Sequence, residues 1–214
     1  MLRNDEPAPE LVEPITRNSI APECRSLEDE QRHLRHMVTI DVRRHAERAG
    51  GSGASGGLSA GGLAMARRLG SQGDRYALVV SSPRERARAT AMAIAQRVDE
   101  VEPMLAEVPD DALTQAQYDT LRSQEDIADL IRSSSGTSRV AEEQVSLWRR
   151  VAQRLRDGES ALLLTHGGNI ELPAVVLATR GGAIVGPLPL GYCEGVRVRF
   201  DQGRAIAVER LSAE

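Results

Sequence analysis

Two histidines in this 214-residue chain each follow a short run of mostly apolar residues. His45 ends the stretch VTIDVRRH with Arg44 just before it, and His166 ends the stretch SALLLTH with Gly167 just after it. A third run, YALVVSS, is followed by Arg86. A neutral imidazole is a good nucleophile near neutral pH, and the planar fork of an arginine matches two phosphate oxygens at once. Histidines and arginines in this pattern therefore point to chemistry on a phosphoryl group.

The elements that must carry these residues alternate between strand and helix. Apolar and β-branched runs predict buried strands at 37–42, 76–82 and 160–166. Helical spacing of apolar residues predicts helices at 59–71, 83–98, 138–158 and about 169–180, with Pro83 in a first turn and Gly158 after a last one. Further predictions are a glycine-rich loop at 50–57, two short helices near 114–122 and 124–133, and a closing hairpin of residues 195–201 and 204–211.

This alternation predicts an α/β fold, a doubly wound three-layer α/β/α sandwich with a mostly parallel sheet and a small helical cap. Ligands of open α/β sheets sit beyond the carboxyl ends of the strands. Since Arg44, His45, Arg86 and His166 all follow predicted strand ends, we expect them to meet in one pocket. A cationic cluster of this kind suits a dianion, and phosphate is the obvious one.

The composition excludes several classes of function. The formal net charge of -4 argues against a nucleic-acid binder that works by bulk charge. The chain contains no lysine, which rules out Schiff-base chemistry and a Walker lysine. Any charge that binds phosphate must therefore come from arginine or from backbone dipoles. No residue pattern calls for a metal or another cofactor.

Composition also suggests how the chain is organised and where it works. Residues 1–36 are rich in proline and charge, and we expect a partly disordered N-terminal extension before a catalytic domain at 37–214. Cys24 and Cys193 lack CxxC spacing, so free thiols in a reducing, cytoplasmic setting are expected. The first residues do not form a signal-peptide pattern, and no apolar run is long enough to span a membrane. The sequence does not indicate an oligomeric state.

Four motifs resemble the histidine phosphatase superfamily, which contains phosphoglycerate mutases and acid phosphatases. RRHAER resembles the Arg-His-Gly signature, with Ala46 in the usual place of glycine, and SSPRERARATA resembles the Ser-Pro-x-x-Arg-Ala-x-x-Thr-Ala motif. LLLTHGGNI is similar to the strand that carries the second histidine. LSAGGLAMARRLG is similar to a family helix, with Ser59 and Met65 replacing threonine and glutamine. The motifs occur in the family's order, from about residue 38 to residue 200.

The resemblance implies a role for each matching residue. His45 would be the nucleophile that becomes phosphohistidine. Arg44 and Arg86 would bind the transferring phosphoryl group, and His166 would donate to it from the other side. The stretch MLAEVPDD supplies Glu107 as the expected proton donor.

The residues beside these positions leave some assignments open. Asp110 and Asp111 follow closely enough to replace Glu107 as the acid. Gly167 and Arg48 are expected to contact the substrate, although Arg48 stands where the family often has a small hydroxyl residue. Arg43, Arg84 and Arg88 are expected to be solvated charges.

The leading hypothesis is a metal-independent phosphatase that hydrolyses small phosphomonoesters through phospho-His45. A phosphoglycerate-type mutase and a protein phosphohistidine phosphatase are the alternative enzymes. A mutase must shield its phosphohistidine from water, and the segment 108–160 is short for that purpose. The alternative without catalysis is an anion-binding module, which the presence of both histidines disfavours.

Overall fold

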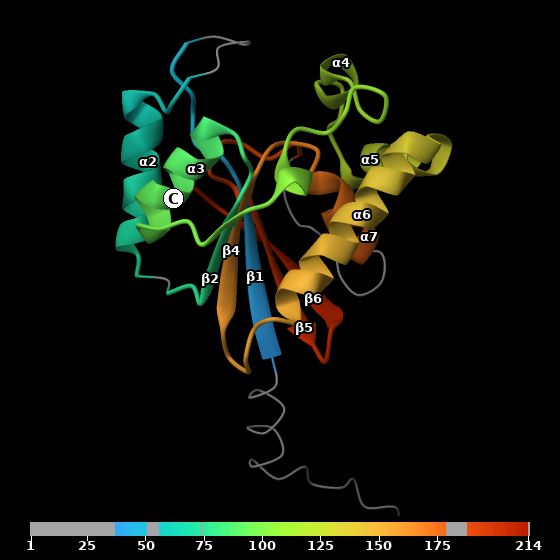
Figure 1. Ribbon diagram of the computed structural model, residues 1–214. Helices are drawn as coiled ribbons and strands as arrows, with labels where there is room; N and C mark the ends of the chain where they lie inside the picture. Colours follow the sequence, from blue (N-terminus) through green and yellow to red (C-terminus); the bar gives the residue numbers. More distant parts are fainter. Residues whose placement is uncertain (1–36, 51–55, 74, 179–187, 214) are drawn as a thin grey trace, which may run out of the picture.

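The computed structural model describes residues 37–50, 56–73, 75–178 and 188–213. The predicted extension at 1–36, the middle of the predicted loop at 50–57 and the end of the helix predicted to reach residue 180 lie outside the described residues. Figure 1 shows a central sheet with helices on both sides. Among the described residues, no helix combines the length and apolar character needed to cross a membrane.

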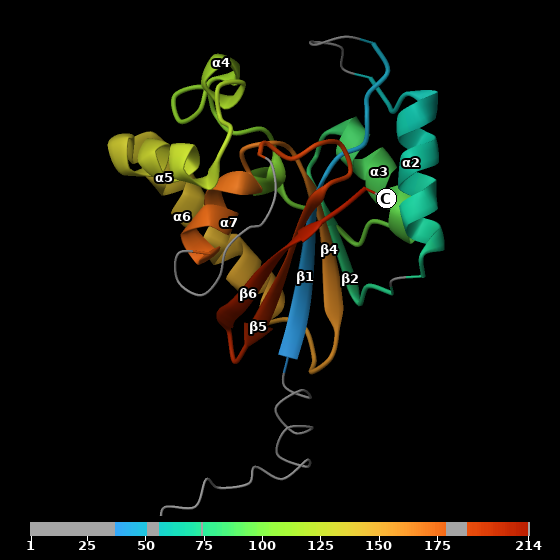
Figure 2. The ribbon, with the colours of Figure 1, turned by 180° about the vertical axis from the view of Figure 1, so that it is seen from behind.

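The sheet has six strands in the order β3-β2-β4-β1-β5-β6 (Figures 1 and 2). Their bounds are β1 Met37–Arg44, β2 Leu78–Ser81, β3 Glu100–Val101, β4 Ser160–Thr165, β5 Gly195–Asp201 and β6 Arg204–Leu211. The pairs β1–β4, β4–β2 and β2–β3 are parallel, whereas β1–β5 and β5–β6 are antiparallel. The predicted hairpin is confirmed, and the predicted parallel sheet is confirmed for the four strands from β3 to β1.

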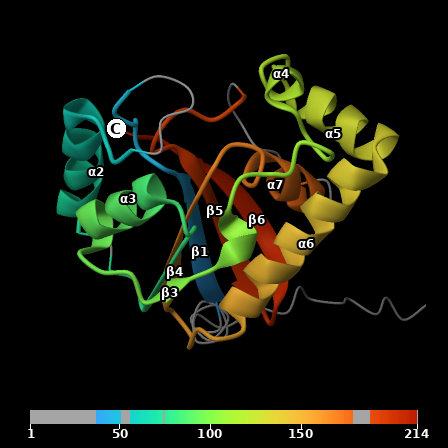
Figure 3. The same cartoon turned by 45° about the horizontal axis from the view of Figure 1, so that its top comes forward.

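Helices cover both faces of the sheet, as predicted for a three-layer sandwich (Figure 3). One face carries α2 (Ala60–Ser71) and α3 (Glu85–Ala95), and the other carries α5 (Gln124–Ser133), α6 (Ser135–Ala152) and α7 (Glu171–Ala178). The short α4 (Gln115–Tyr118) stands above them as the predicted cap, and a 3-10 turn, η1, occupies Pro103–Leu105.

The side chains of β4 alternate between two apolar cores, as expected of a strand buried on both faces. Ala161 and Leu163 join the larger core under α6, which includes Trp148, while Leu162 and Leu164 join the smaller core under α2 and α3. The central strand is therefore held on both sides, and its carboxyl end is a rigid support for whatever follows it.

Three predicted helix boundaries are wrong: the start of α3 and both ends of α6. Helix α3 begins at Glu85 with Arg84 as its extended N-cap, so Pro83 lies before the helix and not in its first turn. Helix α6 begins earlier than predicted because the Ser134 hydroxyl accepts a hydrogen bond from the amide of Thr137. It ends at Ala152, so Gly158 does not stop it. With φ of +78°, Gly158 instead shapes the turn into β4.

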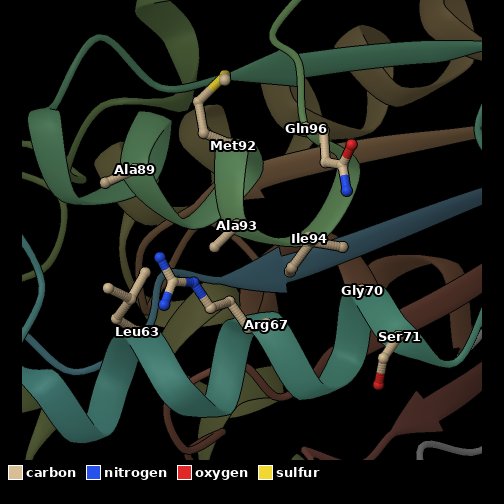
Figure 4. A pocket seen from close by; sticks show the side chains of 9 residues that line it. All are labelled: Leu63, Arg67, Gly70, Ser71, Ala89, Met92, Ala93, Ile94 and Gln96. Carbon is tan, nitrogen blue, oxygen red and sulfur yellow. The ribbon is translucent and has the colours of Figure 1, made fainter.

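A hollow of about 560 Å³ lies between α2 and α3 (Figure 4). Arg67 is the one charged side chain among the residues that line it: Leu63, Arg67, Gly70, Ser71, Ala89, Met92, Ala93, Ile94 and Gln96. This lining contains neither histidine nor carboxylate, so the hollow lacks the residues that the predicted chemistry requires.

Candidate active site

A cavity of about 220 Å³ lies at the carboxyl ends of β1, β2 and β4. Its lining combines charged, aromatic and polar residues with two aliphatic ones: Arg44, His45, Arg48, Arg86, Glu107, Val108, Asp110, Leu113, Thr114, Gln115, Tyr118, His166, Gly167 and Tyr192. The structure thus brings together the predicted site residues except Asp111. Asp111 is exposed and lies 3.9 Å from Arg139, which leaves Asp110 as the nearer alternative to Glu107.

The imidazole of His45 is held in a single tautomer. Its Nδ1 lies 2.7 Å from the carbonyl oxygen of Ala46, which can only accept, so Nδ1 carries the proton and Nε2 is unprotonated. The Nε atom of Arg86 donates to Nε2 at 3.0 Å. Burial, followed by the charges of Arg86, Arg44 and Arg48, lowers the pKa of His45 to about 4 against the opposing effect of the Ala46 hydrogen bond. The ring is therefore neutral at neutral pH, with Nε2 directed at the arginine.

Backbone contacts beyond the end of β1 hold His45 in this place. Its amide donates to the carbonyl of Thr165 at 3.0 Å, and the next amide, that of Ala46, donates to the Thr90 hydroxyl at 3.0 Å. That hydroxyl donates in turn to the carbonyl of Arg86 at 2.7 Å. The methyl group of Ala46 is fully buried in the smaller core, which accommodates the departure from glycine at this position.

Arg44 is held beside His45 by groups that the sequence did not indicate. Its Nη1 donates to the carbonyl of Leu190 at 2.7 Å, and its guanidinium lies 5.0 Å from the ring centre of Tyr192 and 5.9 Å from that of Tyr118. Within the described part of the chain, its buried Nε finds no hydrogen-bond partner. The chain has three tyrosines, and two of them line this cavity. The rarity of tyrosine was the one feature of the sequence that could have pointed to these two residues.

His166 faces His45 across the cavity, with ring centres 5.0 Å apart. Its Nε2 lies 2.9 Å from the Ser82 hydroxyl, and its Nδ1 lies 3.2 Å from Nη2 of Arg86. Burial comes first among the causes that lower the pKa of His166, followed by the charges of His45 and Arg86. Like His45, this ring is neutral at neutral pH, and Ser82 fixes its orientation.

Glu107 neutralises part of the arginine cluster. It accepts from Nε of Arg84 at 2.6 Å and from Nη2 of Arg86. Burial alone would raise its pKa, but the hydrogen bonds from Arg84 and Arg86 contribute to holding that pKa below its ordinary value. The segment before Glu107 is fixed because its backbone accepts hydrogen bonds from Thr165 and Asn169.

Two arginines expected to be solvated have structural partners. Arg84 remains exposed, yet it forms the ion pair with Glu107. Arg43 is buried, and its Nη1 donates at 2.8 Å to the carbonyl oxygens of both Cys193 and Ser212. The expectation fails for Arg43 because the neighbouring loop and the C-terminal segment fold over the end of β1.

The remaining predicted positions lie at the rim. Arg48 forms a β-bridge with Leu58 and lines the cavity together with Gly167. Across the described residues, no group of three or more histidine, cysteine or acidic side chains is arranged to hold a metal ion. The charged side chains that line the cavity, apart from the histidines, are those of Arg44, Arg48, Arg86, Glu107 and Asp110.

Solved structures resemble this fold over most of its length. A phosphoserine phosphatase from Entamoeba histolytica, in complex with 3-phosphoglyceric acid, has a TM-score of 0.59 at 14% identity, covering 82% of this chain and 98% of that one. A phosphoglycerate mutase from Bacillus anthracis has a TM-score of 0.57 at 15% identity, covering 84% and 95%. A mycobacterial glucosyl-3-phosphoglycerate phosphatase has a TM-score of 0.54 at 21% identity, covering 81% and 97%.

At these identities the likeness establishes the fold alone. No curated protein matches the sequence. The family model described as histidine phosphatase superfamily (branch 1) matches residues 34–212, which include all the cavity-lining residues named above. The chain therefore belongs to branch 1 of the histidine phosphatase superfamily.

Proposed function

We propose that this protein is a metal-independent phosphatase that hydrolyses small phosphomonoesters through a phosphohistidine on His45. The observation that carries the proposal is the state of the His45 ring: Nδ1 is bound to the Ala46 carbonyl, while Nε2 is unprotonated and faces Arg86. A nucleophile prepared in this way, beside two cations, suits attack on an anionic phosphorus centre.

In the first step Nε2 of His45 attacks phosphorus, and the bond from phosphorus to the ester oxygen breaks. Arg44, Arg86 and His166 stabilise the charge on the phosphoryl oxygens. Among the described residues, nothing bonds to Nε of Arg44, and this buried donor is one that a phosphate oxygen would satisfy. The products of this step are phospho-His45 and an alkoxide, which needs a proton.

Glu107 is the proposed source of that proton, although it is ionised in the phosphate-free site. A substrate phosphate competes for Arg86, and loss of that ion pair raises the pKa of Glu107. The carboxyl can then take up a proton from solvent or from a monoanionic substrate and pass it to the leaving oxygen. In the second step its carboxylate removes a proton from water, which attacks phosphorus and breaks the phosphorus–nitrogen bond. Inorganic phosphate and neutral His45 result.

The cavity favours small substrates. At about 220 Å³ it is below the roughly 300–1,000 Å³ typical of drug-sized ligand sites. Two of the structural neighbours are phosphatases of small phosphorylated molecules, as their names state. We propose a small phosphorylated metabolite as the substrate. The net charge of -4 supports the absence of a nucleic-acid partner, and the two cysteines without CxxC spacing support the cytoplasm as the compartment.

The test compares hydrolysis of p-nitrophenyl phosphate by the parent and by the His45→Ala variant. We expect kcat to fall by more than about 10³-fold. Turnover of labelled phosphate ester, quenched in alkali because phosphohistidine is labile in acid, should leave label on the parent only. Chelators should leave the parent's activity intact and vanadate should inhibit it. Arg88→Gln is the matched control and should retain activity, because Arg88 lies two residues after Arg86 on α3, is exposed and does not line the cavity.

Full activity in His45→Ala would exclude the proposal. Tight phosphate binding without turnover by the parent would favour the anion-binding module. A mutase would transfer label between substrate and product hydroxyls in preference to water, and a phosphohistidine phosphatase would act faster on a phosphohistidine protein than on small esters.

A further inference from the structure

Glu171, the first residue of α7, is a carboxylate enclosed by the protein, with only 1% of its surface exposed. Its two oxygens accept three hydrogen bonds. Oε2 accepts from the amide of Gly168 at 2.7 Å, and Oε1 accepts from the Tyr118 hydroxyl at 2.8 Å and from the amide of Leu190 at 3.0 Å. A buried carboxylate is costly unless its oxygens are hydrogen-bonded, so the site is built around these donors.

Helix capping accounts for only one of the three bonds. The amide of Leu172 donates to the carbonyl of Gly168, so Gly168 precedes the first turn of α7. The bond from the amide of Gly168 to Glu171 then matches one half of a capping box. It occupies Oε2 alone. Oε1 accepts from two other segments, at Tyr118 and Leu190, which are distant in sequence and have no part in capping α7.

All three donors belong to segments that border the phosphate pocket. Leu190 bonds Glu171 through its amide and Arg44 through its carbonyl, the latter at 2.7 Å. Tyr118 lies beside the Arg44 guanidinium, and its hydroxyl packs so closely on Gly167 that a Cβ there would be 2.3 Å away. Glu171 itself is not among the residues that line the cavity. One buried carboxylate therefore fixes both an arginine and a backbone turn of the pocket without facing its ligand.

We propose that Glu171 and Tyr118 form a positioning pair for the phosphate site, holding Arg44 and the His166–Gly168 turn in the arrangement that receives a phosphoryl group. The inference rests on the proposed function in taking phosphate as the ligand. Burial, with the charge of Glu171, raises the pKa of Tyr118 above its ordinary value, so the hydroxyl stays protonated and able to donate. The pair acts through Arg44 and Gly167 and takes no part in bond making.

The experiment uses Tyr118→Phe, Glu171→Gln and the double variant of the full chain. Tyr118→Phe keeps the ring beside Arg44 and removes only the hydroxyl. The matched control is Tyr76→Phe, because Tyr76 donates at 2.9 Å to another fully buried carboxylate, Asp41, away from the cavity. Three quantities are measured for each protein: the Kd of inorganic phosphate by calorimetry, kcat and KM for p-nitrophenyl phosphate, and Tm.

We expect Tyr118→Phe and Glu171→Gln each to weaken phosphate binding by roughly fivefold, the effect of losing one hydrogen bond. The double variant should weaken phosphate binding by less than the product of the two single fold-changes, because Tyr118 and Glu171 share that hydrogen bond. kcat should fall in the same variants, whereas Tyr76→Phe should lower Tm and change neither the Kd nor kcat by more than about twofold.

If both pocket variants lower Tm but keep the parent's phosphate affinity and kcat, the pair is only structural and the inference is wrong. The binding readout does not depend on turnover. A parent that binds phosphate without hydrolysis would overturn the proposed function, and loss of that binding in Tyr118→Phe and Glu171→Gln would still support the inference. A parent that binds no phosphate would overturn both.

Discussion

Nε of Arg86 donates to Nε2 of His45 at 3.0 Å, so this hydrogen bond occupies the lone pair with which His45 is proposed to attack phosphorus. The same guanidinium contacts Glu107 through Nη2, and that atom lies 3.2 Å from Nδ1 of His166. A phosphoryl group that binds Arg86 would draw its guanidinium away from His45 and from Glu107. In one exchange it would free the lone pair of His45 and release Glu107 to take up a proton.

The acid limb of kcat/KM should lie well below the ordinary pKa of histidine. The active form of His45 is neutral, and burial with the nearby arginines lowers its pKa to about 4, so the free enzyme stays competent until the pH approaches that value. The measurement is a profile of kcat/KM for p-nitrophenyl phosphate from pH 3.5 upward. An acid limb centred near the ordinary value of 6.5 would contradict this account.

Removing the arginine charges should raise the pKa of His45 in a fixed order. Arg86 contributes more than Arg48 to lowering that pKa, so Arg86→Gln should raise it further than Arg48→Gln does. Nuclear magnetic resonance titration of the imidazole signals measures both variants even where activity is lost. The chain has only four histidines, and His45→Asn identifies the signal. Unchanged titration in Arg86→Gln would show that the contact at 3.0 Å does not govern the ring.

Glu107→Gln should slow the hydrolysis of alkyl phosphates far more than that of p-nitrophenyl phosphate. An alkoxide needs a proton as it leaves, and a well-placed acid contributes about 10²–10⁴-fold, whereas p-nitrophenolate leaves without one. The measurement is the ratio of kcat/KM for the two substrates in parent and variant. Asp110→Asn is the matched control at the rim of the same cavity. If Asp110→Asn shows the larger selective loss, Asp110 is the proton donor and Glu107 is only a partner of the arginines.

The folded protein should lose stability as the pH falls from about 6.5 toward 4. His45 has a lowered pKa in the folded state, so the unfolded chain binds more protons in this range and protonation favours unfolding. The shift from 6.5 to about 4 corresponds to about 3 kcal/mol in the acid limit, and His166 acts in the same direction. Urea unfolding at pH 7 and pH 4.5 measures the loss. His45→Asn should show a smaller difference, and an equal one would assign the effect to other groups.

Gly167→Ala should damage the site although it adds only a methyl group. The new Cβ would lie 2.3 Å from the hydroxyl oxygen of Tyr118, so either the ring or the turn after His166 must move. We expect a loss of about 1–3 kcal/mol in stability together with weaker phosphate binding. Gly61→Ala is the control: its Cβ would meet nothing closer than 3.6 Å, and alanine inside α2 should be neutral or stabilising. Thermal unfolding of the two variants decides between these expectations.

Much of the fold could be predicted because its signals are local. The apolar runs of β1, β2 and β4, the helical spacing in α2 and α6, and the hairpin turn at Gln202–Gly203 are each legible within a short window. The misplaced ends of α6 have two origins. Ser134 begins the helix through a local cap, the hydrogen bond from the Thr137 amide, which the prediction missed. Gly158 turns the chain toward β4, and its amide donates to the carbonyl of Met37, a contact that depends on how the elements pack.

The sequence by itself determined which residues are candidates for the chemistry and at which end of the sheet they meet. That is so because parallel strands present their carboxyl ends at one edge, and His45, Arg86 and His166 each follow such an end. Only the tertiary structure decided the state of those residues. The lowered pKa of His45, the ionised form of Glu107, and the support of Arg44 by Leu190 and Tyr118 all depend on partners distant in sequence or on burial. A pKa is set by what surrounds a group in space, and no spacing along the chain records that.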